Sequence, residues 1–529
     1  MTFRYATYPS RRSPVLARNA VATSQPLATQ AGIAMLAQGG NALDAALAAA
    51  ITLTVVEPTG NGLGSDAFCI LWDGKELHGL NASGRSPAAW TPERFRPLTE
   101  MPTRGWETVT VPGAISAWVD LSARFGRLPF SALFAPAIEH AERGFLVSPV
   151  IADLWQRGAV ELKDQPGFAA HFMPNGSAPR AGELFRSSAL AQSLGMIAES
   201  KGEAFYSGAL AEKIAAFAHQ HGAALTAKDL ARHRNDWCGT MHQDFAAVAL
   251  HEIPPNGQGI AALMALGILA ETDFAGLKPD SADALHLQIE AIKLAFADLA
   301  AYVADLDHMN AVTPVDLLQP EYLRRRAKTI DRNRAQVFGA GAPKEGGTVC
   351  LAAADADGMM VSYIQSNYAG FGSGVVVPST GISLQNRGLG FTLTPGHPNC
   401  VGPSKRPFHT IIPGFIMKGR APEMAFGLMG GSMQAQGHVQ MTVRTMLWNQ
   451  DPQTAADAPR WRFNAGLDVA LEPAIGEATI AALAERGHRV TVEPPDASYA
   501  FGGAQLIRRI EGGYIAGSDP RKDGCASGF

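Results

Sequence analysis

The hydrophobic pattern divides the chain into a helix-rich portion that extends to about residue 310 and a strand-rich portion that follows it. An amphipathic helix is predicted over residues 30–38, and the two glycines that follow it, Gly39 and Gly40, are expected to end it. A second, alanine-rich helix is predicted to begin after Asn41, whose side chain can cap it, and to continue to about Val55. Farther along, DALHLQIEAIKLAFADLAAYVAD has the spacing of a helix with one apolar face, formed by Leu285, Ile289, Ile292 and Phe296.

Short apolar runs bounded by turn residues predict strands over residues 67–72, 348–354 and 359–365. The first of these runs follows the glycine-rich segment GNGLGS, which has Ser65 where a dinucleotide-binding loop has its third glycine. This segment also leads into a strand rather than a helix, so we interpret it as a tight backbone turn beside a site. Residues 343–347, PKEGG, indicate an exposed linker between the two portions of the chain.

Composition and charge favour a compact globular protein that acts on small molecules. Hydrophobic residues form 47% of the 529 residues and charged residues 17%, which is not the composition of a disordered or fibrous chain. The net charge is −4 and the basic residues are scattered, so the sequence lacks the electrostatic signature of a nucleic-acid-binding protein. We therefore expect no nucleic-acid partner.

The cysteines and the apolar runs indicate which cellular compartment the sequence favours. The five cysteines are widely spaced and include no C-x-x-C pair, which argues against a disulfide framework and a zinc ribbon. The N-terminal residues have no apolar signal-peptide core, and the longest apolar runs are shorter than the ~20 residues that a membrane-spanning helix needs. We expect a cytoplasmic protein with no membrane association. No His/Asp/Glu cluster was found at metal-ligand spacing, so neither a metal nor another cofactor is expected.

The segment GGTVCLAAADADG contains a candidate nucleophile, Thr348, between two glycines and a buried strand. Cleavage of the Gly347–Thr348 bond would make Thr348 a new N-terminus. Its free α-amine, with an ordinary pKa of about 7.7 to 8, could then take the proton of its own hydroxyl. A threonine at the start of a strand is more often an ordinary strand residue, and this interpretation stays open on the spacing alone.

Several spaced segments together resemble the γ-glutamyltransferase family in order and spacing, over about residues 20 to 529. They include GNALDAALAAAITLTVVEPTGNGLGSDAF, TVPGAISAW, FAPAIEHAERGF, IPPNGQGIAAL, GGTVCLAAADADG, GFGSGVVVPSTGISLQN, GPSKRP, GGSMQ and GSDPR. The resemblance implies an α+β fold, the four-layer αββα sandwich of the N-terminal nucleophile hydrolases. It also implies an inactive precursor that cleaves itself into a helix-rich large subunit, 1–347, and a small subunit, 348–529, which together form one compact unit.

The resemblance also assigns catalytic roles. It implies that Thr348 attacks an amide carbonyl and forms an acyl-enzyme. Gly430 and Gly431 match the paired glycines whose N–H groups form the family's oxyanion hole; a plain turn is the alternative. Ser366 occupies the place of a family threonine that orients the nucleophile, and it retains the hydroxyl.

Substrate-binding positions differ from those of the glutathione-cleaving members that the sequence resembles. Gly390 stands where those members have an aspartate for the substrate ammonium, and Arg387 stands where they have a neutral amide or an acid. His409 and Thr410 replace two serines, and Tyr368 replaces an asparagine. Loss of an acid and gain of an arginine favour a carboxylate over an ammonium group.

Three of these assignments have structural alternatives. Arg85, two residues from the position of the family's carboxylate-binding arginine, is a candidate ligand or a salt-bridge residue. Arg387 is a ligand or an exposed surface arginine, and His409 is a hydrogen-bond donor or a packed core residue.

The predicted function is therefore that of a self-processing amidohydrolase that cleaves a small carboxylate-bearing amide, oxamate-like or glutaryl-like. One alternative is a γ-glutamyl hydrolase or transferase that acts on glutathione. Another, of a different class, is a non-catalytic binding protein that retains the fold. The expected partners are the small-molecule amide and the two subunits from one precursor; a homo-oligomer of the processed heterodimer stays open.

Overall fold

Two seven-stranded, antiparallel sheets form the centre of the molecule in a computed structural model that describes residues 12–338 and 347–529. The sheet that contains β10 comprises, in spatial order, β21 (Cys525–Gly528), β2 (Ala20–Thr23), β10 (Gly347–Ala354), β11 (Met360–Tyr368), β3 (Asp66–Trp72), β4 (Leu77–Asn81) and β7 (Asp236–Trp237). The sheet that contains β15 comprises β1 (Val15–Ala17), β20 (Gly513–Ser518), β19 (Gly503–Ile510), β15 (Ala421–Met429), β14 (Gly414–Lys418), β9 (Val248–Glu252) and β8 (Met241–Phe245). With many helices around these sheets, the chain is of the α+β class that the sequence predicts.

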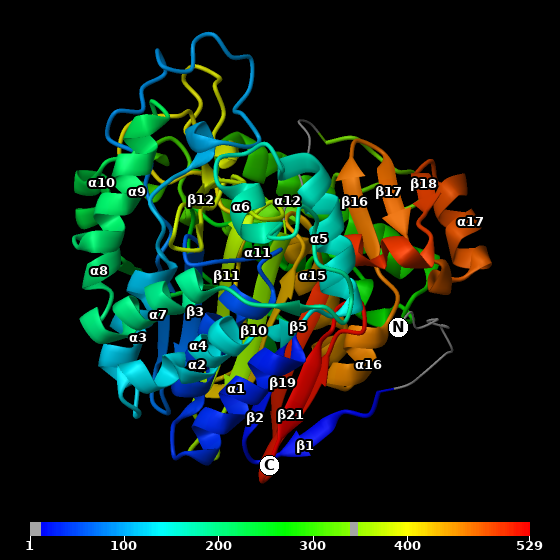
Figure 1. The fold of residues 1–529 in the computed structure, drawn as a ribbon. Coiled ribbons are helices and arrows are strands. Elements are labelled where there is room, and N and C mark those ends of the chain that lie inside the picture. The colour runs from blue at the N-terminus through cyan, green and yellow to red at the C-terminus, as the bar shows by residue number, and fades with distance from the viewer. Residues whose placement is uncertain (1–11, 339–346) are drawn as a thin grey trace.

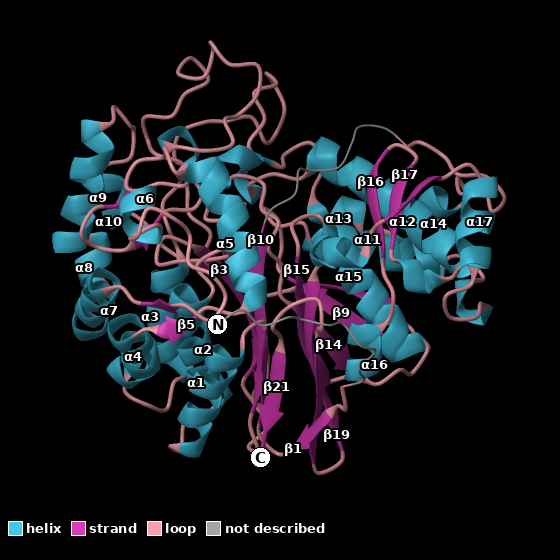
Figure 2. Cartoon of the chain, turned by 45° about the vertical axis from the view of Figure 1, so that its right-hand side comes forward, coloured by secondary structure: helices cyan, strands magenta, loops and turns pink. Residues whose placement is uncertain are grey.

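The helices form two groups, one on the outer side of each sheet (Figure 2). The group beside the β10 sheet comprises α1 (Pro26–Ala37), α2 (Ala42–Val56), α3 (Ala114–Phe125), α4 (Ala135–Arg143), α5 (Pro149–Leu162), α6 (Phe168–Phe172), α7 (Ser188–Ser200), α8 (Glu203–Tyr206), α9 (Ala209–Gln220) and α10 (Ala227–Ala231). The group beside the β15 sheet comprises α11 (Gly259–Ala270), α12 (Ala282–Tyr302), α13 (Pro314–Leu317), α14 (Pro320–Ala327), α15 (Met433–Thr442), α16 (Pro452–Asp457) and α17 (Glu477–Glu485).

Small strand pairs and a third sheet lie outside the two central sheets. They are β5 (Phe145–Leu146) with β6 (Leu184–Phe185), β12 (Val376–Val377) with β13 (Ile382–Ser383), and the three-stranded sheet of β16 (Trp461–Ala465), β17 (Asp468–Leu471) and β18 (Arg489–Val492). In Figure 1 the three-stranded sheet and α17 lie together at one side of the molecule.

The alternation of side chains along β10 explains why this strand lies at the centre. Leu351 and Ala353 pack with the helices on one face, whereas Ala352 and Ala354 pack with apolar residues of the β15 sheet on the other. Because successive side chains of a strand point to opposite faces, a strand buried on both faces favours apolar residues at successive positions. This is why the predicted strand at 348–354 reads as a continuous apolar run. Its linker neighbours, residues 339–346, lie outside the described part of the chain.

The two N-terminal helices agree with the prediction in kind but not in every boundary. Asn41 caps α2, and its side chain and that of Asp44 exchange hydrogen bonds with each other's backbone N–H. The prediction that the first helix begins at residue 30 is wrong, because α1 begins at Pro26. Proline at the first helical position needs no N–H partner, and the Gln25 side chain accepts from the N–H groups of Leu27 and Ala28.

Helix α12 differs from the prediction of one apolar face. The four predicted core residues are buried, but so are five polar ones, His286, Gln288, Glu290, Lys293 and Asp298. Buried polar groups need partners. Those of His286 come from distant parts of the chain, whereas Glu290 accepts from Lys293 on the same helix and from the distant Gln336.

The segment GNGLGS forms the tight turn that the sequence predicts. A Cβ on Gly62 would lie 2.2 Å from the hydroxyl oxygen of Ser383, and one on Gly64 would lie 2.4 Å from the carbonyl oxygen of Ser383. Only glycine permits this close backbone approach. The turn precedes β3 and lies against the end of β11, where the N–H of Asn367 donates to the carbonyl of Gly60 (3.1 Å).

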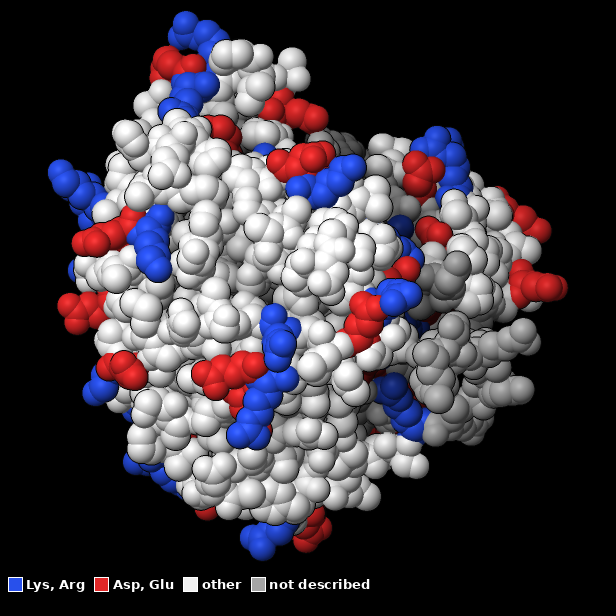
Figure 3. All heavy atoms as spheres, viewed as in Figure 1, with Lys and Arg blue, Asp and Glu red and all other residues white. Residues whose placement is uncertain are grey.

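Positive and negative side chains are interspersed on the face shown in Figure 3, in agreement with the small net charge. Among the helices of residues 12–338 and 347–529, none is both long and apolar enough to cross a membrane.

Candidate active site

The register of β10 on β11 places Thr348 opposite two residues at once. Gly347 pairs with Tyr368 and Val349 pairs with Gln365, so the single residue Thr348 faces both Ser366 and Asn367. This is a β-bulge, a feature that redirects side chains and is common beside active sites. The backbone of Thr348 belongs to the described strand, whereas its side chain lies outside the described part of the structure. The predicted nucleophile and the predicted orienting hydroxyl of Ser366 therefore lie on adjacent strands.

Ser366 is fully buried, and its hydroxyl oxygen accepts from the N–H of Tyr368 at 2.8 Å. The bond fixes the hydroxyl at the bulge. Tyr368 itself has a backbone φ of +83°, a conformation that a residue with a bulky side chain rarely adopts. The bulge thus carries local strain beside Thr348, as functional sites commonly do.

Arg387 is buried, with an exposed fraction of only 1%, so it is not the surface arginine of the alternative interpretation. Its guanidinium lies 4.7 Å from the ring centre of Tyr368, and its Nη1 donates to the Thr410 hydroxyl at 3.0 Å. The Nε and Nη2 groups have no hydrogen-bond partner among the described residues. A buried guanidinium with two unused donors is unfavourable by itself, and a bidentate carboxylate would satisfy it.

His409 is fully buried and joins β3 to the segment after KRPF. Its Nε2 lies 3.2 Å from an oxygen of Asp66, while its Nδ1 accepts from the N–H of Ile411 at 3.4 Å. The neutral ring with its proton on Nε2 satisfies both contacts, so His409 donates to Asp66. The ring also packs edge-on against Phe68, with centroids 4.8 Å apart. His409 is therefore both a packed core residue and a hydrogen-bond donor.

The other oxygen of Asp66 accepts from the N–H groups of Gly84 (3.1 Å) and Gly113 (3.0 Å). A Cβ on either glycine would collide with a backbone carbonyl, 1.5 Å away for Gly84 and 1.6 Å away for Gly113. Both glycines are needed for this close approach. Asp66 is thus held rigidly at the beginning of β3, where it pairs with Ser366 across the sheet.

Burial sets the ionisation of these groups. It raises the pKa of Asp66 to about 7, although the positive charge of Arg387 opposes the change. Burial also lowers the pKa of Arg387 to about 10, and the pKa of His409 is well below its ordinary value because of burial and then of Arg387. Asp66 therefore titrates near neutral pH, while Arg387 stays a cation and His409 stays neutral.

Gly430 and Gly431 follow the end of β15, and both have a left-handed backbone, with φ of +130° and +60°. Neither N–H donates a hydrogen bond to a described residue. The side chain of Gln258 donates to the carbonyl of Gly431 at 2.7 Å and also to the carbonyl of Thr410. This amide links the glycine pair to Thr410 and hence to Arg387. The arrangement leaves two N–H groups available to stabilise an oxyanion.

Cavities lie on two sides of these residues. One of about 430 Å³ is lined by Gly430, Phe371 and Tyr499, among others, and one of about 400 Å³ is lined by Tyr368, Gly390 and Phe408, among others. A larger cavity, of about 900 Å³, contains none of the predicted site residues. The two smaller cavities provide space for a small substrate beside the glycine pair and beside Tyr368.

Gly390 is tightly packed rather than an open binding position. A Cβ there would lie 2.3 Å from the carbonyl oxygen of Phe408. Since the backbone lies so close, an aspartate at position 390 would need the main chain to move. The absence of an acid at position 390 therefore goes together with the close packing of the local backbone, and a change of this one side chain would not restore the ammonium-binding site.

Arg85 is not in contact with these residues. It forms an ion pair with Asp305 (3.0 Å) and lies 3.9 Å from Asp236, on the wall of a separate cavity of about 320 Å³. These contacts are the ones expected if Arg85 is a salt-bridge residue. A ligand role for Arg85 stays a prediction.

Two residues with positions in the site were missed by sequence reasoning. Asp66 is the acid of GNGLGSDAF and is the first residue of the buried strand β3, where a charged residue is rare. Gln258 follows the turn IPPNG and begins a wholly apolar helix. In both cases the signal was a polar residue at the edge of a buried element.

A further cluster contradicts the prediction that no His/Asp/Glu group has ligand spacing. His286 and Glu290 stand one helical turn apart on α12, a spacing that a sequence search for paired ligands can find. The fold brings His488 to them.

Comparison with known proteins agrees with this site. The family model for gamma-glutamyltranspeptidase matches residues 28–529. An oxamate amidohydrolase proenzyme of Klebsiella pneumoniae is 37% identical and covers 95% of this chain and 97% of its own length. A glutathione hydrolase-like YwrD proenzyme of Bacillus subtilis is 35% identical and covers 98% of this chain and all of its own.

Among solved structures, a cephalosporin acylase from Bacillus halodurans has a TM-score of 0.95 and 46% identity, and the match covers 100% of this chain and 99% of the other. The chain belongs to the gamma-glutamyltranspeptidase family. It is an amide hydrolase or acyltransferase, which confirms the prediction of an enzyme over a non-catalytic binding protein.

Proposed function

We propose that the protein is made as a precursor, cleaves itself between Gly347 and Thr348, and hydrolyses a small amide that carries a carboxylate on its acyl side. The two products, residues 1–347 and 348–529, stay together as one unit with the helix–sheet–sheet–helix order of an αββα sandwich, and they act in the cytoplasm. The proenzyme names of the relatives support the precursor. The bulge opposite Ser366 supports the position of the new N-terminus.

The single observation that carries the substrate class is the buried guanidinium of Arg387, whose Nε and Nη2 have no partner among the described residues. It lies on Tyr368, which pairs with Gly347 across the sheet. An acyl group whose carboxylate binds Arg387 would therefore lie close to the beginning of the proposed small subunit. The oxamate amidohydrolase relative supports a short acid, and the cephalosporin acylase supports acyl-group chemistry on an amide.

In the proposed reaction, the free α-amine of Thr348 takes the hydroxyl proton while the hydroxyl oxygen attacks the amide carbonyl. The N–H groups of Gly430 and Gly431 stabilise the negative charge on the carbonyl oxygen. The C–N bond then breaks, the leaving amine receives the proton, and an ester with Thr348 is left. Water attacks this ester, the acid is released, and the free hydroxyl of Thr348 is regenerated.

The first experiment tests processing. Purified protein should give two chains on a denaturing gel, with masses that correspond to residues 1–347 and 348–529, whereas Thr348→Ala should give one. An active protein with an intact Gly347–Thr348 bond would refute the nucleophile.

The second experiment tests the substrate class. The processed protein is supplied with oxamate, glutaryl amides and a γ-glutamyl anilide, and the released amine or ammonia is measured. Turnover of the carboxylate-bearing amides without an α-amino group is expected to exceed that of the anilide. A clear preference for the anilide would support the glutathione-directed alternative, for which the glutathione hydrolase-like relative is the present support.

A further inference from the structure

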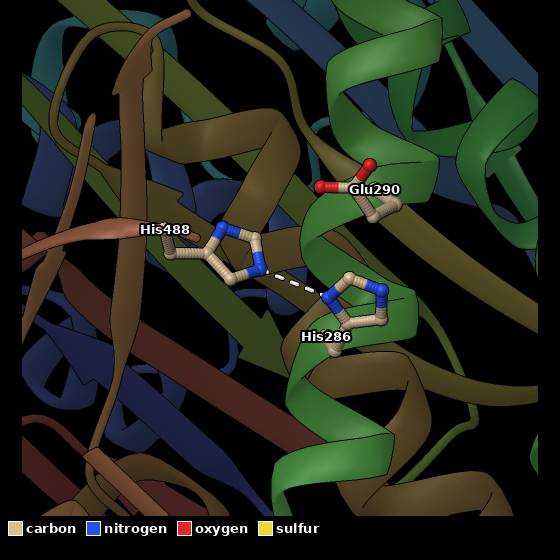
Figure 4. A group of neighbouring side chains, drawn as sticks. All are labelled: His286, Glu290 and His488. Carbon is tan, nitrogen blue, oxygen red and sulfur yellow. Dashed lines mark hydrogen bonds between the residues drawn. The ribbon is translucent and has the colours of Figure 1, made fainter. Parts of the chain in front are cut away.

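A second polar cluster, apart from the candidate active site, lies buried between α12 and the segment that joins α17 to β18. Figure 4 shows His286 and Glu290 on α12, one turn apart, with His488 directed toward His286. One ligand atom from each of the three residues lies within 4.8 Å of the other two. All three side chains are buried, with exposed fractions of at most 3%.

The hydrogen bonds fix the proton positions in this cluster. His286 Nε2 donates to the carbonyl of Asp331 at 2.8 Å, so Nδ1 of the neutral ring carries a lone pair. That lone pair is directed at Nε2 of His488, 2.9 Å away, which must therefore carry a proton. The other ring nitrogen of His488, Nδ1, is buried and has no partner among the described residues.

His286 is arranged like a metal-binding histidine, because one ring nitrogen already donates to a backbone carbonyl and the other carries a lone pair. Histidine ligands commonly donate their second ring N–H to a backbone carbonyl, which fixes the ring and leaves the other nitrogen for the ion. Glu290 is oriented in the same way, because its oxygens accept from Lys293 Nζ (2.6 Å) and from the N–H of Gln336 (3.1 Å). Each carboxylate oxygen can accept at a second lone pair, so one stays available to an ion.

We propose that His286, Glu290 and His488 bind one Zn²⁺ ion, with water as the fourth ligand. Two imidazoles and one carboxylate are a typical zinc donor set, whereas Ca²⁺ and Mg²⁺ prefer oxygen ligands. Metal–ligand distances of about 2.1 Å in a tetrahedron place ligand atoms about 3.4 Å apart. The two imidazoles must separate by a few tenths of an ångström, and the carboxylate must move inward. The proton on Nε2 of His488 is displaced to the unpartnered Nδ1, so the ring stays neutral.

The site joins parts of the chain that the proposed cleavage would separate. His286 and Glu290 lie in residues 1–347 and His488 lies in residues 348–529, and this division rests on the proposed function. The outer partners Asp331 and Gln336 lie close to the end of the proposed large subunit. The ion would therefore hold α12 and the end of one subunit to the other subunit after cleavage.

Metal content provides the test, because it does not depend on cleavage or on activity. The full chain is expressed with zinc in the medium, desalted in the presence of EDTA, and analysed for bound metal. We expect about one zinc per chain, retained because the ligands are buried. We also expect that protein grown with Co²⁺ instead shows the visible absorption of tetrahedral cobalt.

Matched variants separate ligation from stability. Glu290→Gln, which keeps the shape of the side chain, and His488→Ala are each expected to lose the metal. His78→Ala, which alters the separate group Asp73, Glu76 and His78, is expected to keep it. Metal-free wild-type protein, metal that persists in Glu290→Gln and His488→Ala, or loss of metal in His78→Ala would each overturn the proposal.

A second measurement tests the link between the subunits. In the processed protein, removal of zinc with a chelator in mild urea should increase dissociation of the two chains, and Glu290→Gln should dissociate to the same extent without chelator. Stoichiometric zinc with no effect of chelator on dissociation would refute the link. If the protein is not processed, the metal content still shows whether the zinc site exists. A failure of the proposed cleavage is therefore distinguishable from a failure of the proposed zinc site.

Discussion

The guanidinium of Arg387 lies 4.7 Å from the ring centre of Tyr368, and Tyr368 is the residue that pairs with Gly347 across the β10 sheet. A guanidinium can lie against an aromatic ring in a cation–π contact while its N–H groups stay available to a ligand. Nη1 is bonded to Thr410, and the two remaining buried donors are Nε and Nη2. These two lie on one edge of the guanidinium and match the two oxygens of a carboxylate.

Replacement of Arg387 by lysine should therefore reduce activity although the charge is kept. An ammonium cannot form the paired contact with a carboxylate or stack on the Tyr368 ring. We expect kcat/KM for carboxylate-bearing amides to fall by about 10- to 100-fold, the effect of one charge-assisted contact of about 1.5 to 3 kcal/mol. Steady-state kinetics with a glutaryl amide measure this.

The control is an amide of the same length without the carboxylate, whose turnover should change much less in Arg387→Lys. The exposed Arg143 provides a matched variant, Arg143→Lys, for which no change is expected. Equal losses for the charged and the neutral amide would indicate that Arg387 acts only through stability.

Introduction of an aspartate at Gly390 should not create an enzyme for γ-glutamyl substrates. The new Cβ would lie 2.3 Å from the carbonyl oxygen of Phe408, a contact that the backbone cannot tolerate without moving. We expect Gly390→Asp and Gly390→Ala to lower the melting temperature by several degrees, as overpacking of about 1 to 3 kcal/mol does. Thermal unfolding and a γ-glutamyl anilide assay measure the two effects.

Gly195→Ala is the matched control, because a Cβ at that helical position meets no atom within 4 Å. It should leave the melting temperature unchanged or raise it slightly. A stable Gly390→Asp protein that hydrolyses the anilide would show that one side chain, and not the local packing, excludes glutamyl substrates.

Asp66 should make substrate binding depend on pH near neutrality. Burial raises its pKa to about 7, above that of the unfolded chain. Its contribution to folding stability is therefore fully present below the unfolded pKa, near ~4, and is lost as the pH rises through about 7. Ionised Asp66 also offsets the positive charge of Arg387. We expect KM for an anionic amide to rise between about pH 6 and about pH 8, and this rise to be absent in Asp66→Asn.

Glu57 provides a control for this titration. Burial raises its pKa to about 7 as well, but its described partners are Ser24 and Lys522 rather than Arg387. Glu57→Gln should therefore alter the pH dependence of urea unfolding and leave the pH dependence of KM unchanged. A KM profile that Asp66→Asn does not alter would exclude the electrostatic link between Asp66 and Arg387.

Local signals predict some of the elements. The cap at Asn41 acts through neighbours in the sequence, and the apolar run of β10 is itself a sequence pattern, so both are visible without the fold. The glycines of GNGLGS are visible as a turn signal, but the atoms that require them belong to the distant Ser383. The start of α1 was misplaced because Gln25 is not a typical capping residue. The burial of His286 on α12 could not be predicted, because its partners come from other segments.

The candidate site shows the same division. The positions of Arg387, Thr410 and the glycine pair followed from the family resemblance, but their contacts did not. Asp66 and His409 are 343 residues apart, and no local pattern relates them. The contact between Gln258 and both Thr410 and Gly431 likewise exists only in the folded chain.

Substitution of Gly431 by alanine should impair catalysis more than substrate binding. Its φ of +60° is unfavourable for alanine, so the peptide would rotate and its N–H would turn away from the developing oxyanion. Loss of one such donor lowers kcat by about 100- to 1,000-fold, while KM should change by only a few-fold because the donor acts mainly on the transition state. Gly419→Ala, with a φ of +58° in an exposed turn where a Cβ meets no atom within 4 Å, carries the same backbone strain away from the site and should retain wild-type kinetics. Both variants should first be checked for cleavage at residue 347 by mass spectrometry. A processed Gly431→Ala protein with undiminished kcat would remove this glycine from the oxyanion hole.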